Sequence, residues 1–514
     1  MDTKIIYGLL FCLFFSDILF GQEVRLDSTF GTGGKVSYDF GNAYSNARDV
    51  LIQHEGKIVV GGYTLTANNS DFSILRLLTN GQIDSSFATN GYRLSNSQFD
   101  GNDYGFSFTQ LSDSSFILTG ASQTTPSRPS SGVVRYDTSG VQKMFVNFNV
   151  GPLADSTFKA VVLPNGNILI GGWDGLNIDF CLLGILPNLL GPDPIFGTEA
   201  KVCISDSEMS RMYDMALQSD GKILAVGESK FRGEKDFIIA RFNSDGSLDS
   251  SFAVHGIFRQ DFNSNKESAF VVLPTFGSKT LIAGTGSFKD SLGFNMIRLN
   301  SSGQLDTTFG DSGIVRESFT LYPGGKSLIK LPDGKLIAVG SRYNGASEDF
   351  VLAGFTIDGI IDSTFGQNGM LLTDFEGTDD RAYSVTYDSS SHSLFVVGES
   401  VDDTSAVFAI AKYNLGARVG LETFPSIIQE AKLYPNPSKS GSQLKFSLQN
   451  SSSLTIDILD LQGRSLRNII RDQFFYSGAH EVDVAMDEIP AGVYTLRMLS
   501  RAGFSQIVRF VKLP

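Results

Sequence analysis

A short segment, Leu26 to Val36 with the sequence LDSTFGTGGKV, recurs along most of this chain and limits the folds available to it. Further copies begin at Ile83, Leu248, Leu305 and Ile361, and a degenerate copy begins at Asp193. Near-copies of one segment at regular distances are the signature of a repeat protein, in which each unit buries its apolar residues against its neighbours.

A second recurring pattern gives the period of the repeat. It is an apolar run that ends in glycine, such as Ile223 to Gly227. The closing glycines are Gly62, Gly120, Gly172, Gly227, Gly284, Gly340 and Gly398, which are 58, 52, 55, 57, 56 and 58 residues apart. Seven units of this length are typical of propeller and kelch arrays.

Each unit contains four strand-like runs separated by tight turns. In the fourth unit the turns are Ser219 to Lys222 and Asn243 to Gly246, and both contain the Asp-Gly pair that hairpin turns favour. Seven four-stranded sheets can bury both faces by packing radially around an axis, so we predict an all-β fold with a seven-bladed β-propeller. An open β-solenoid is the alternative fold.

The two ends of the repeat region are complementary. The last unit's third run, Val407 to Tyr413, has no copy of the recurring segment after it, whereas Leu26 to Val36 has no strand before it. We therefore expect the N-terminal segment to complete the sheet that begins near residue 383, which would close the ring without a free edge.

Arg and Asp recur eight residues apart across a turn, as in Arg241 and Asp249. Such spacing makes them cross-strand neighbours, and identical pairs in successive units indicate a structural role instead of a catalytic ring. Gly354 replaces the Arg in one unit while the Asp remains. We expect these Asp residues to accept hydrogen bonds from the following turn; they are Asp27, Asp84, Asp249, Asp306 and Asp362.

Two cysteines remain once Cys12 is assigned to a leader segment. If the residues from Pro187 to Thr198 connect two strands of a hairpin, Cys181 and Cys203 lie opposite each other. The sequence leaves open whether they form a disulfide or stay as two buried thiols.

These repeats resemble the delta-60 type of propeller repeat, found in bacterial secreted proteins. The resemblance covers residues 26–414, and we place the propeller domain at 22–415. The second unit departs from the pattern, because Val141 to Val150 lacks the Asp and Phe-Gly elements.

A second domain is expected at residues 431–514, after a linker at 416–430. Its short alternating runs, among them Leu444 to Leu448 and Leu454 to Leu459, predict a small β-sandwich. The tail resembles the type IX secretion C-terminal sorting domain of Bacteroidetes. The residues that carry the resemblance are Tyr434, Pro435, Asn436, Pro437, Asp460, Gly463, Gly492, Tyr494 and Lys512.

The N-terminus reads as an export signal at residues 1–21. Lys4 supplies the positive charge at its start, and residues 5 to 15 form its apolar run. Gly21 is a small residue at a plausible cleavage position. The apolar run is shorter than the roughly 20 residues that a membrane-spanning helix needs. Together with the tail, the signal implies passage through the periplasm, recognition by the type IX secretion machinery, and release or attachment to surface lipopolysaccharide.

Composition and motifs exclude several classes of partner and of catalytic or metal site. A net charge of −14 argues against nucleic acid as a partner. Gly310 to Gly313 spells a serine-protease loop but occupies a repeat turn, and the four histidines lack metal-ligand spacing. We therefore expect no cofactor, with calcium in Asp- and Asn-rich turns as an alternative. Trp173, the only tryptophan, could stack on a sugar or simply pack.

The expected function is binding of a protein or glycan by a monomeric, secreted or surface-attached propeller that is not an enzyme. The alternative is a polysaccharide hydrolase or lyase with an active site at the axis of the ring.

Overall fold

The structure is a computed structural model that describes residues 24 to 513 apart from some short segments. Those segments are 42–43, 98–100, 126–127, 150–155, 175–178, 206–208, 232, 263–266, 276–277, 289–290, 321–326, 417–427, 440, 449–450, 460–464, 487–488 and 501–504. The expected signal peptide lies outside the described residues, as does most of the expected linker. Within the described part, no helix is long and apolar enough to cross a membrane.

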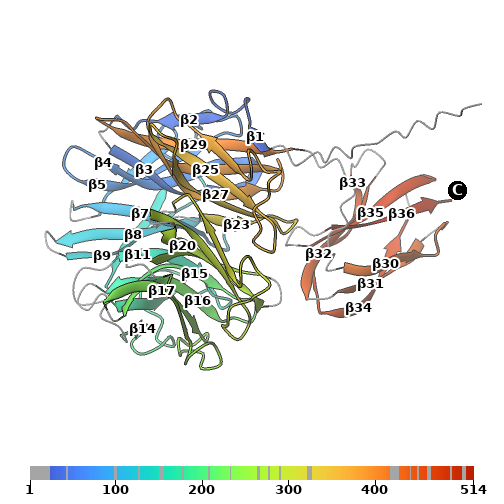
Figure 1. Cartoon of the computed structure of the whole chain (residues 1–514). Helices are drawn as coiled ribbons and strands as arrows, with labels where there is room; N and C mark the ends of the chain where they lie inside the picture. The colour runs from blue at the N-terminus through green and yellow to red at the C-terminus, as the bar shows by residue number, and fades with distance from the viewer. Residues whose placement is uncertain are drawn as a thin grey trace, which may run out of the picture.

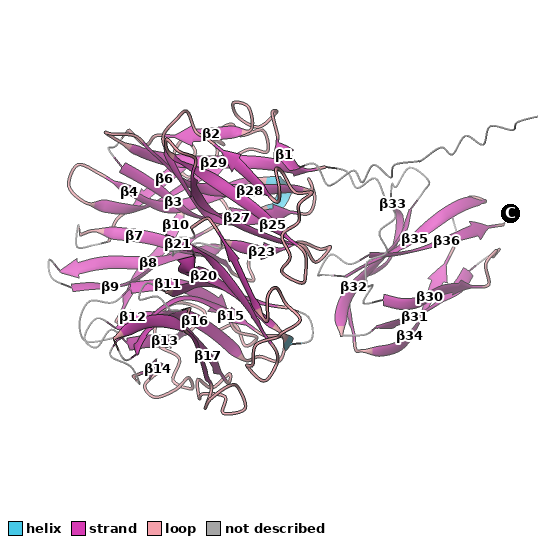
Figure 2. Cartoon of the chain, viewed as in Figure 1, coloured by secondary structure: helices cyan, strands magenta, loops and turns pink. Residues whose placement is uncertain are grey.

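The described part is almost entirely β-structure, with a short 3-10 helix at His54–Gly56 (Figures 1 and 2). The first group of strands comprises β3 (Tyr44–Ile52), β4 (Ile58–Leu65), β5 (Ser70–Leu77) and β6 (Tyr92–Ser95). The second comprises β7 (Asp103–Gln110), β8 (Phe116–Thr125), β9 (Arg128–Tyr136) and β10 (Gln142–Phe148). The third comprises β11 (Ser156–Val162), β12 (Ile168–Asp174), β13 (Asp179–Ile185) and β14 (Lys201–Ile204).

The next three groups comprise β15 (Met209–Leu217), β16 (Ile223–Phe231), β17 (Glu234–Phe242) and β18 (Ile257–Gln260); β19 (Ser268–Pro274), β20 (Thr280–Phe288), β21 (Ser291–Leu299) and β22 (Ile314–Glu317); and β23 (Leu328–Lys330), β24 (Leu336–Tyr343), β25 (Glu348–Phe355) and β26 (Met370–Thr373). In each group, consecutive strands pair antiparallel. We number these groups as units one to six in chain order.

The seventh unit joins the two ends of the repeat region. It contains β27 (Asp379–Asp388), β28 (Ser393–Val401) and β29 (Ala406–Leu415). Two N-terminal strands, β1 (Val24–Leu26) and β2 (Lys35–Tyr38), pair antiparallel with β29. The first strand of each unit contacts the first strand of the next, and β27 contacts β3, so the ring is closed. The predicted propeller class and its closure by the N-terminus are confirmed, and the open solenoid is wrong.

Glycines with a positive φ form the tight turns within each unit. Gly221, between β15 and β16, has a φ of 83°, and Gly246, just after β17, has a φ of 89°. Residues with a Cβ rarely adopt this backbone conformation. The Asp-Gly pairs therefore mark these turns as the sequence predicts.

The recurring segment fastens each unit to the next. In the copy at 248–256 the Asp249 amide donates to the Arg241 carbonyl on β17 at 2.9 Å, and the Phe252 side chain is fully buried. The amide of Ala253, the next residue, donates to the Ser302 carbonyl of the following unit at 2.8 Å. Gly310 makes the same bond to Asp358 at 2.7 Å. Gly31, Ala88 and Gly197 make the equivalent bond in the copies at 26, 83 and 193. We call these five copies clasps, because each joins two neighbouring units.

The Asp of the clasp is buried and neutralised by two cations. Oδ2 of Asp249 lies 2.8 Å from Nε of Arg241 and 2.6 Å from Nζ of Lys222. Its Oδ1 accepts a hydrogen bond from the Ser251 amide at 3.1 Å, as expected for the turn. Arg241 also donates to the Ser301 carbonyl of the next unit at 2.7 Å, so the ion pair takes part in the contact between units.

The units that lack the Arg show why the Asp remains. Where Gly354 replaces Arg, Lys335 alone pairs with Asp362 at 2.8 Å. In the clasp that closes the ring, Lys412 of β29 pairs with Asp27 at 2.9 Å. A cation from a neighbouring strand is therefore kept even when the Arg is lost.

Cys181 and Cys203 are directly paired across β13 and β14 with their Cα atoms 4.2 Å apart, and they form a disulfide. The disulfide lies in the unit that contains the degenerate copy of the clasp. There the Asp193 amide still donates to the Gly184 carbonyl at 2.8 Å.

The C-terminal domain consists of two packed sheets. They are built from β30 (Ile428–Tyr434), β31 (Gly441–Leu448) and β34 (Gly478–Ala485), and from β32 (Ser452–Leu459), β33 (Ser465–Phe475), β35 (Gly492–Ser500) and β36 (Ser505–Lys512). Sequence reasoning missed β30 and β33. The first begins inside the expected linker, and β33 carries charged and apolar residues without regular alternation.

Replacing Asp249 by Asn should lower the free energy of unfolding by about 3 to 5 kcal/mol, because Arg241 would be left buried without its counterion. Chemical unfolding followed by circular dichroism measures this loss. The matched control is Asp245→Asn, an exposed turn residue whose replacement should cost less than about 0.5 kcal/mol. Equal stability of the two variants would contradict the structural role of the clasp.

Acid should weaken the same contacts. Burial raises the pKa of the Asp84 carboxyl, but hydrogen bonds from Ser86 and the charge of Arg76 outweigh burial and lower it to about 2, from an ordinary value of 3.8. The pKa of Asp27 is likewise lowered to about 2. These carboxylates stabilise the fold above the ordinary pKa, and their contribution is lost as the pH falls toward the folded-state value.

The urea midpoint should therefore fall between neutral pH and about pH 3. The Asp84→Asn variant should show a smaller fall over this range. A urea midpoint that does not change between these pH values would show that the clasps are not charged pairs in solution.

Candidate binding site at the propeller axis

The first strand of six units carries a β-bulge at the same place. In β7, for example, the pairing with β8 shifts between Gly105 and Ser107, so Phe106 is the extra residue. The closing glycine of the second strand explains the position, since a Cβ on Gly120 would lie 1.8 Å from the Tyr104 carbonyl oxygen. The recurring glycine that gives the period is thus required by the bulge.

The bulged residues gather around the axis of the ring. They are Arg48, Phe106, Phe158, Tyr213, Phe270 and Tyr383, and we call them the axial belt. The ring centroids of Phe106 and Phe158 are 4.7 Å apart, and those of Tyr213 and Phe270 are 5.1 Å apart. The guanidinium of Arg48 lies 4.0 Å from the Tyr383 ring centroid, which links the first unit to the seventh.

A polar layer adjoins the axial belt. Asp49 accepts hydrogen bonds from Ser384 at 2.7 Å and from Ser107 at 3.0 Å. Lys159 donates to Ser107 at 3.1 Å and lies 4.0 Å from Asp214. Side chains from five units therefore meet next to the belt in one chain of hydrogen bonds that ends in the ion pair of Lys159 with Asp214.

The fourth and seventh units share a further set of residues. In both, a Glu follows the closing glycine and pairs across the strands with an Arg, which gives Arg211 with Glu228 and Arg381 with Glu399. The belt tyrosine of the same unit lies two residues after the Arg. We call Arg211, Tyr213 and Glu228 with Arg381, Tyr383 and Glu399 the axial site.

Glu399 is 1% exposed and holds its half of the site together. One carboxylate oxygen accepts from the Tyr383 hydroxyl at 2.9 Å and from Arg381 at 3.3 Å. The other accepts from the Tyr44 hydroxyl at 2.6 Å and from Asn46 at 2.5 Å. The charge of Glu399 is therefore fully met by protein donors.

Glu228 is held in a similar way. Its carboxylate lies 3.5 Å from Arg211 and 2.9 Å from Lys235, and it accepts from the Ser268 hydroxyl of the next unit at 2.5 Å. The guanidinium of Arg211 also lies 5.1 Å from the Trp173 ring centroid. The Arg211 side chain is 32% exposed, whereas that of Glu228 is 3% exposed, so the cation is the half of the pair that meets solvent.

The tyrosines of the site act as neutral hydrogen-bonding groups. Burial raises the pKa of both Tyr213 and Tyr383, and the nearby Glu228 and Glu399 raise it further. The site thus combines protonated phenols, partly exposed guanidinium groups and aromatic faces. Sequence reasoning missed it, although the Glu after the closing glycine in two of the seven units was a visible signal.

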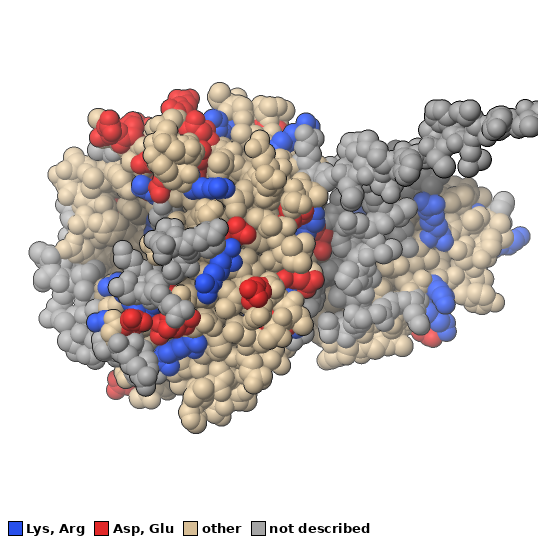
Figure 3. Space-filling view, viewed as in Figure 1, with Lys and Arg blue, Asp and Glu red and all other residues tan. Residues whose placement is uncertain are grey.

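Charge is distributed without one dominant patch on the face drawn in Figure 3. Acidic and basic side chains are interspersed over the coloured part of the propeller there. The net charge of −14 is therefore not gathered in one area of that face.

The sorting-motif residues gather at one edge of the C-terminal domain. Asn436 donates to the Arg509 carbonyl at 2.9 Å and accepts from the Val511 amide at 2.9 Å. This fixes the segment from Tyr434 to Pro437 against β36, near Lys512. Tyr494 is fixed through its hydroxyl, which donates to the Pro490 carbonyl at 2.8 Å beside Gly492.

Two predicted sorting residues, Asp460 and Gly463, lie outside the described residues. Among the described residues of the motifs, Asn436 and Tyr494 form hydrogen bonds with backbone groups. The Tyr434 residue is 75% exposed. Motifs that are far apart in sequence thus meet, because the opening loop of the domain and its last strand are bonded together.

Family models match both parts of the chain. Four segments match a model described as a domain of unknown function (DUF5122) beta-propeller, at residues 53–87, 218–252, 278–309 and 331–365. Residues 432–512 match the Secretion system C-terminal sorting domain. The chain therefore carries propeller repeats and a type IX sorting domain, which indicates export to the cell surface or extracellular space. The finer delta-60 assignment stays a prediction.

Several solved structures are similar to most of the chain at low sequence identity, while no curated protein matches it. A polysaccharide lyase, an ulvan lyase bound to -[GlcA(1-4)Rha3S]-, is 12% identical with a TM-score of 0.44 over 74% of this chain and 96% of its own. Polysaccharide lyase Uly1 is 9% identical with a TM-score of 0.41 over 77% and 97%. A glucose dehydrogenase is 10% identical with a TM-score of 0.37 over 75% and 99%.

These comparisons contradict the expectation that the chain is not an enzyme, because the two lyases and the dehydrogenase named above are enzymes, and we withdraw it. The similarity is one of fold, so no reaction is carried over to this chain from it.

Deleting residues 428–514 should leave a folded propeller that stays in the periplasm, because the sorting domain is the part that the type IX machinery reads. Cell fractionation with a thermal melt of the recovered protein measures both properties. Surface display of the shortened chain at the level of the intact one would contradict the sorting role.

Proposed function

We propose that this exported propeller binds a glycan at the axial site. The observation that carries the proposal is the duplicated set of Arg, Tyr and Glu in the fourth and seventh units, placed beside a belt of aromatic side chains. Trp173 belongs to the same surface, since its ring lies next to Arg211.

The chemistry of the site supports a sugar as the ligand. Aromatic rings pack against the apolar face of a sugar, and planar polar groups such as guanidinium form paired hydrogen bonds with neighbouring oxygens. Glu228 and Glu399 hold Arg211 and Arg381 in fixed orientations, which lowers the entropy lost when a ligand binds. A protein ligand is the other class expected from the sequence, and the test below separates the two.

The test is a glycan array probed with the chain from residue 22 to 514. Replacing Trp173 by Ala should weaken binding of the selected glycan at least tenfold, which corresponds to about 1.4 kcal/mol. Replacing Arg211 by Met should do the same, because the paired donor is lost while the apolar stem is kept. Isothermal titration calorimetry measures both affinities.

Tyr343→Ala is the matched control, because Tyr343 is 65% exposed and lies at the end of β24 in a unit without the Glu. Its affinity should equal that of the unchanged protein. Binding that survives loss of both Trp173 and Arg211, or an array without any bound glycan, would overturn the proposal. The same sugars are assayed for cleavage, and turnover abolished by Tyr383→Phe would make the site catalytic.

A further inference from the structure

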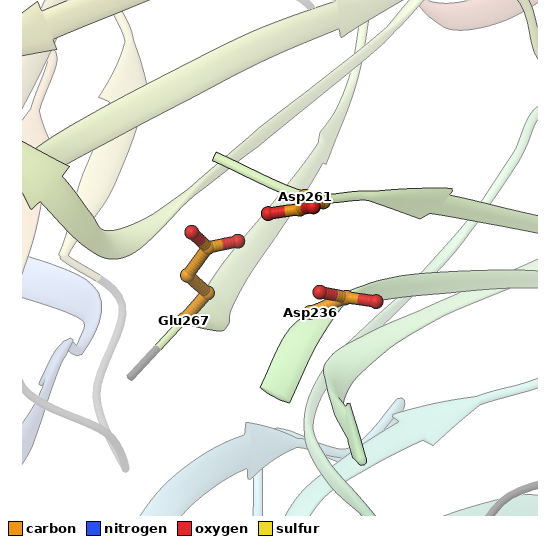
Figure 4. A group of neighbouring side chains, drawn as sticks. All are labelled: Asp236, Asp261 and Glu267. Atoms are coloured by element: carbon orange, nitrogen blue, oxygen red, sulfur yellow. The ribbon is translucent and has the colours of Figure 1, made fainter. Parts of the chain in front are cut away.

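Three carboxylates from two units meet at the junction of the fourth and fifth units (Figure 4). Asp236 belongs to β17, Asp261 follows β18, and Glu267 precedes β19. One oxygen of each lies within 4.8 Å of the others. The group sits at the opposite ends of the strands from the clasps, and none of its members takes part in the axial site.

An equivalent group occurs at the junction of the sixth and seventh units. Asp349 of β25, Asp374 after β26 and Asp380 of β27 satisfy the same distance limit. The equivalence extends to the backbone, since the Phe375 amide donates to Asp380 at 2.7 Å and the Phe262 amide donates to Glu267 at 2.7 Å. The two groups are distinguished by a buried hydroxyl that lies on the same face as the first group, as described below.

Protein donors meet the charge of the second group. Asn344 donates to both oxygens of Asp349 at 2.9 Å, the Gly377 amide donates to Asp374 at 2.6 Å, and the Thr378 hydroxyl donates to Asp380 at 2.9 Å. We therefore treat this group as a hydrogen-bonded loop anchor and as an internal control.

The first group has an additional oxygen beside it. Ser229 is the cross-strand partner of Asp236, so the two side chains project from the same face of the sheet. Ser229 is fully buried, and its hydroxyl has no hydrogen-bond partner among the described residues. A buried hydroxyl without a partner is unfavourable, and a bound cation would accept its lone pair.

The charges point the same way. Three carboxylates that meet at one junction repel one another, and a bound cation would offset that repulsion. Every donor in the group is a carboxylate or hydroxyl oxygen, the type that Ca²⁺ prefers and that Zn²⁺ and Cu²⁺ sites seldom use alone.

We propose that Asp236, Asp261 and Glu267, with the Ser229 hydroxyl, bind a Ca²⁺ ion that joins the fourth and fifth units. The site differs from the turn sites considered from sequence, because its ligands come from strand ends of two units. Bound calcium would hold the two units together at the end of the strands opposite the clasps.

The test compares thermal melts of the chain from residue 22 to 514 in millimolar CaCl₂, in MgCl₂ and in EGTA, with calorimetric titration of CaCl₂. Calcium should raise the melting temperature more than magnesium does, with a dissociation constant on the order of 10⁻⁴ to 10⁻³ M, as in other extracellular modules. The Asp261→Asn and Glu267→Gln variants should lose this rise, and Asp374→Asn should keep it.

Asp261 is exposed, so we expect the Asp261→Asn variant to fold. This variant therefore still tests the site if Glu267→Gln does not fold. Equal melting temperatures in CaCl₂ and EGTA would overturn the proposal, as would a calcium effect that persists in Asp261→Asn.

Discussion

The ring depends on a buried carboxylate that recurs at the junctions between units. In the clasps that begin at Leu26, Ile83, Leu248 and Leu305, the Asp pairs with a cation from its own unit, and the segment after it bonds to the turn of the next unit. Since the Asp249 side chain is buried away from solvent, its charge must be neutralised by cations on neighbouring strands. This explains why Lys335 or Lys412 is present where the Arg is missing.

The axis is built by a second constraint, the close approach of two backbones. In six units the closing glycine of the apolar run lets the first strand bulge toward it, and the bulge directs one side chain to the axis. Six such side chains form the axial belt, and where a Glu follows the glycine an Arg and a Tyr are fixed beside it. The same glycine that is needed for folding therefore also positions the candidate binding site.

The two ends of each strand serve different purposes. Clasps stabilise the ring at one end, where the β15–β16 turn also brings Lys222 to Asp249, while the acidic groups occupy the other end. The fourth and seventh units carry the axial site, and the fourth also contributes to the proposed calcium site. Loss of symmetry among otherwise similar repeats is thus the best indicator of function in this molecule, because residues that recur in every unit serve the fold.

The sequence by itself determined the propeller class, the ring closure and the sorting domain, since these follow from periodic patterns and local motifs that each unit repeats. It also placed Asp249 in a structural role from its spacing to Arg241. It could not reveal the axial belt, because Arg48, Phe106 and Tyr383 differ in type and become neighbours only when the bulges and the ring bring them together. The same holds for Asp236 and Glu267, which belong to different units and meet only across a junction that the tertiary structure creates.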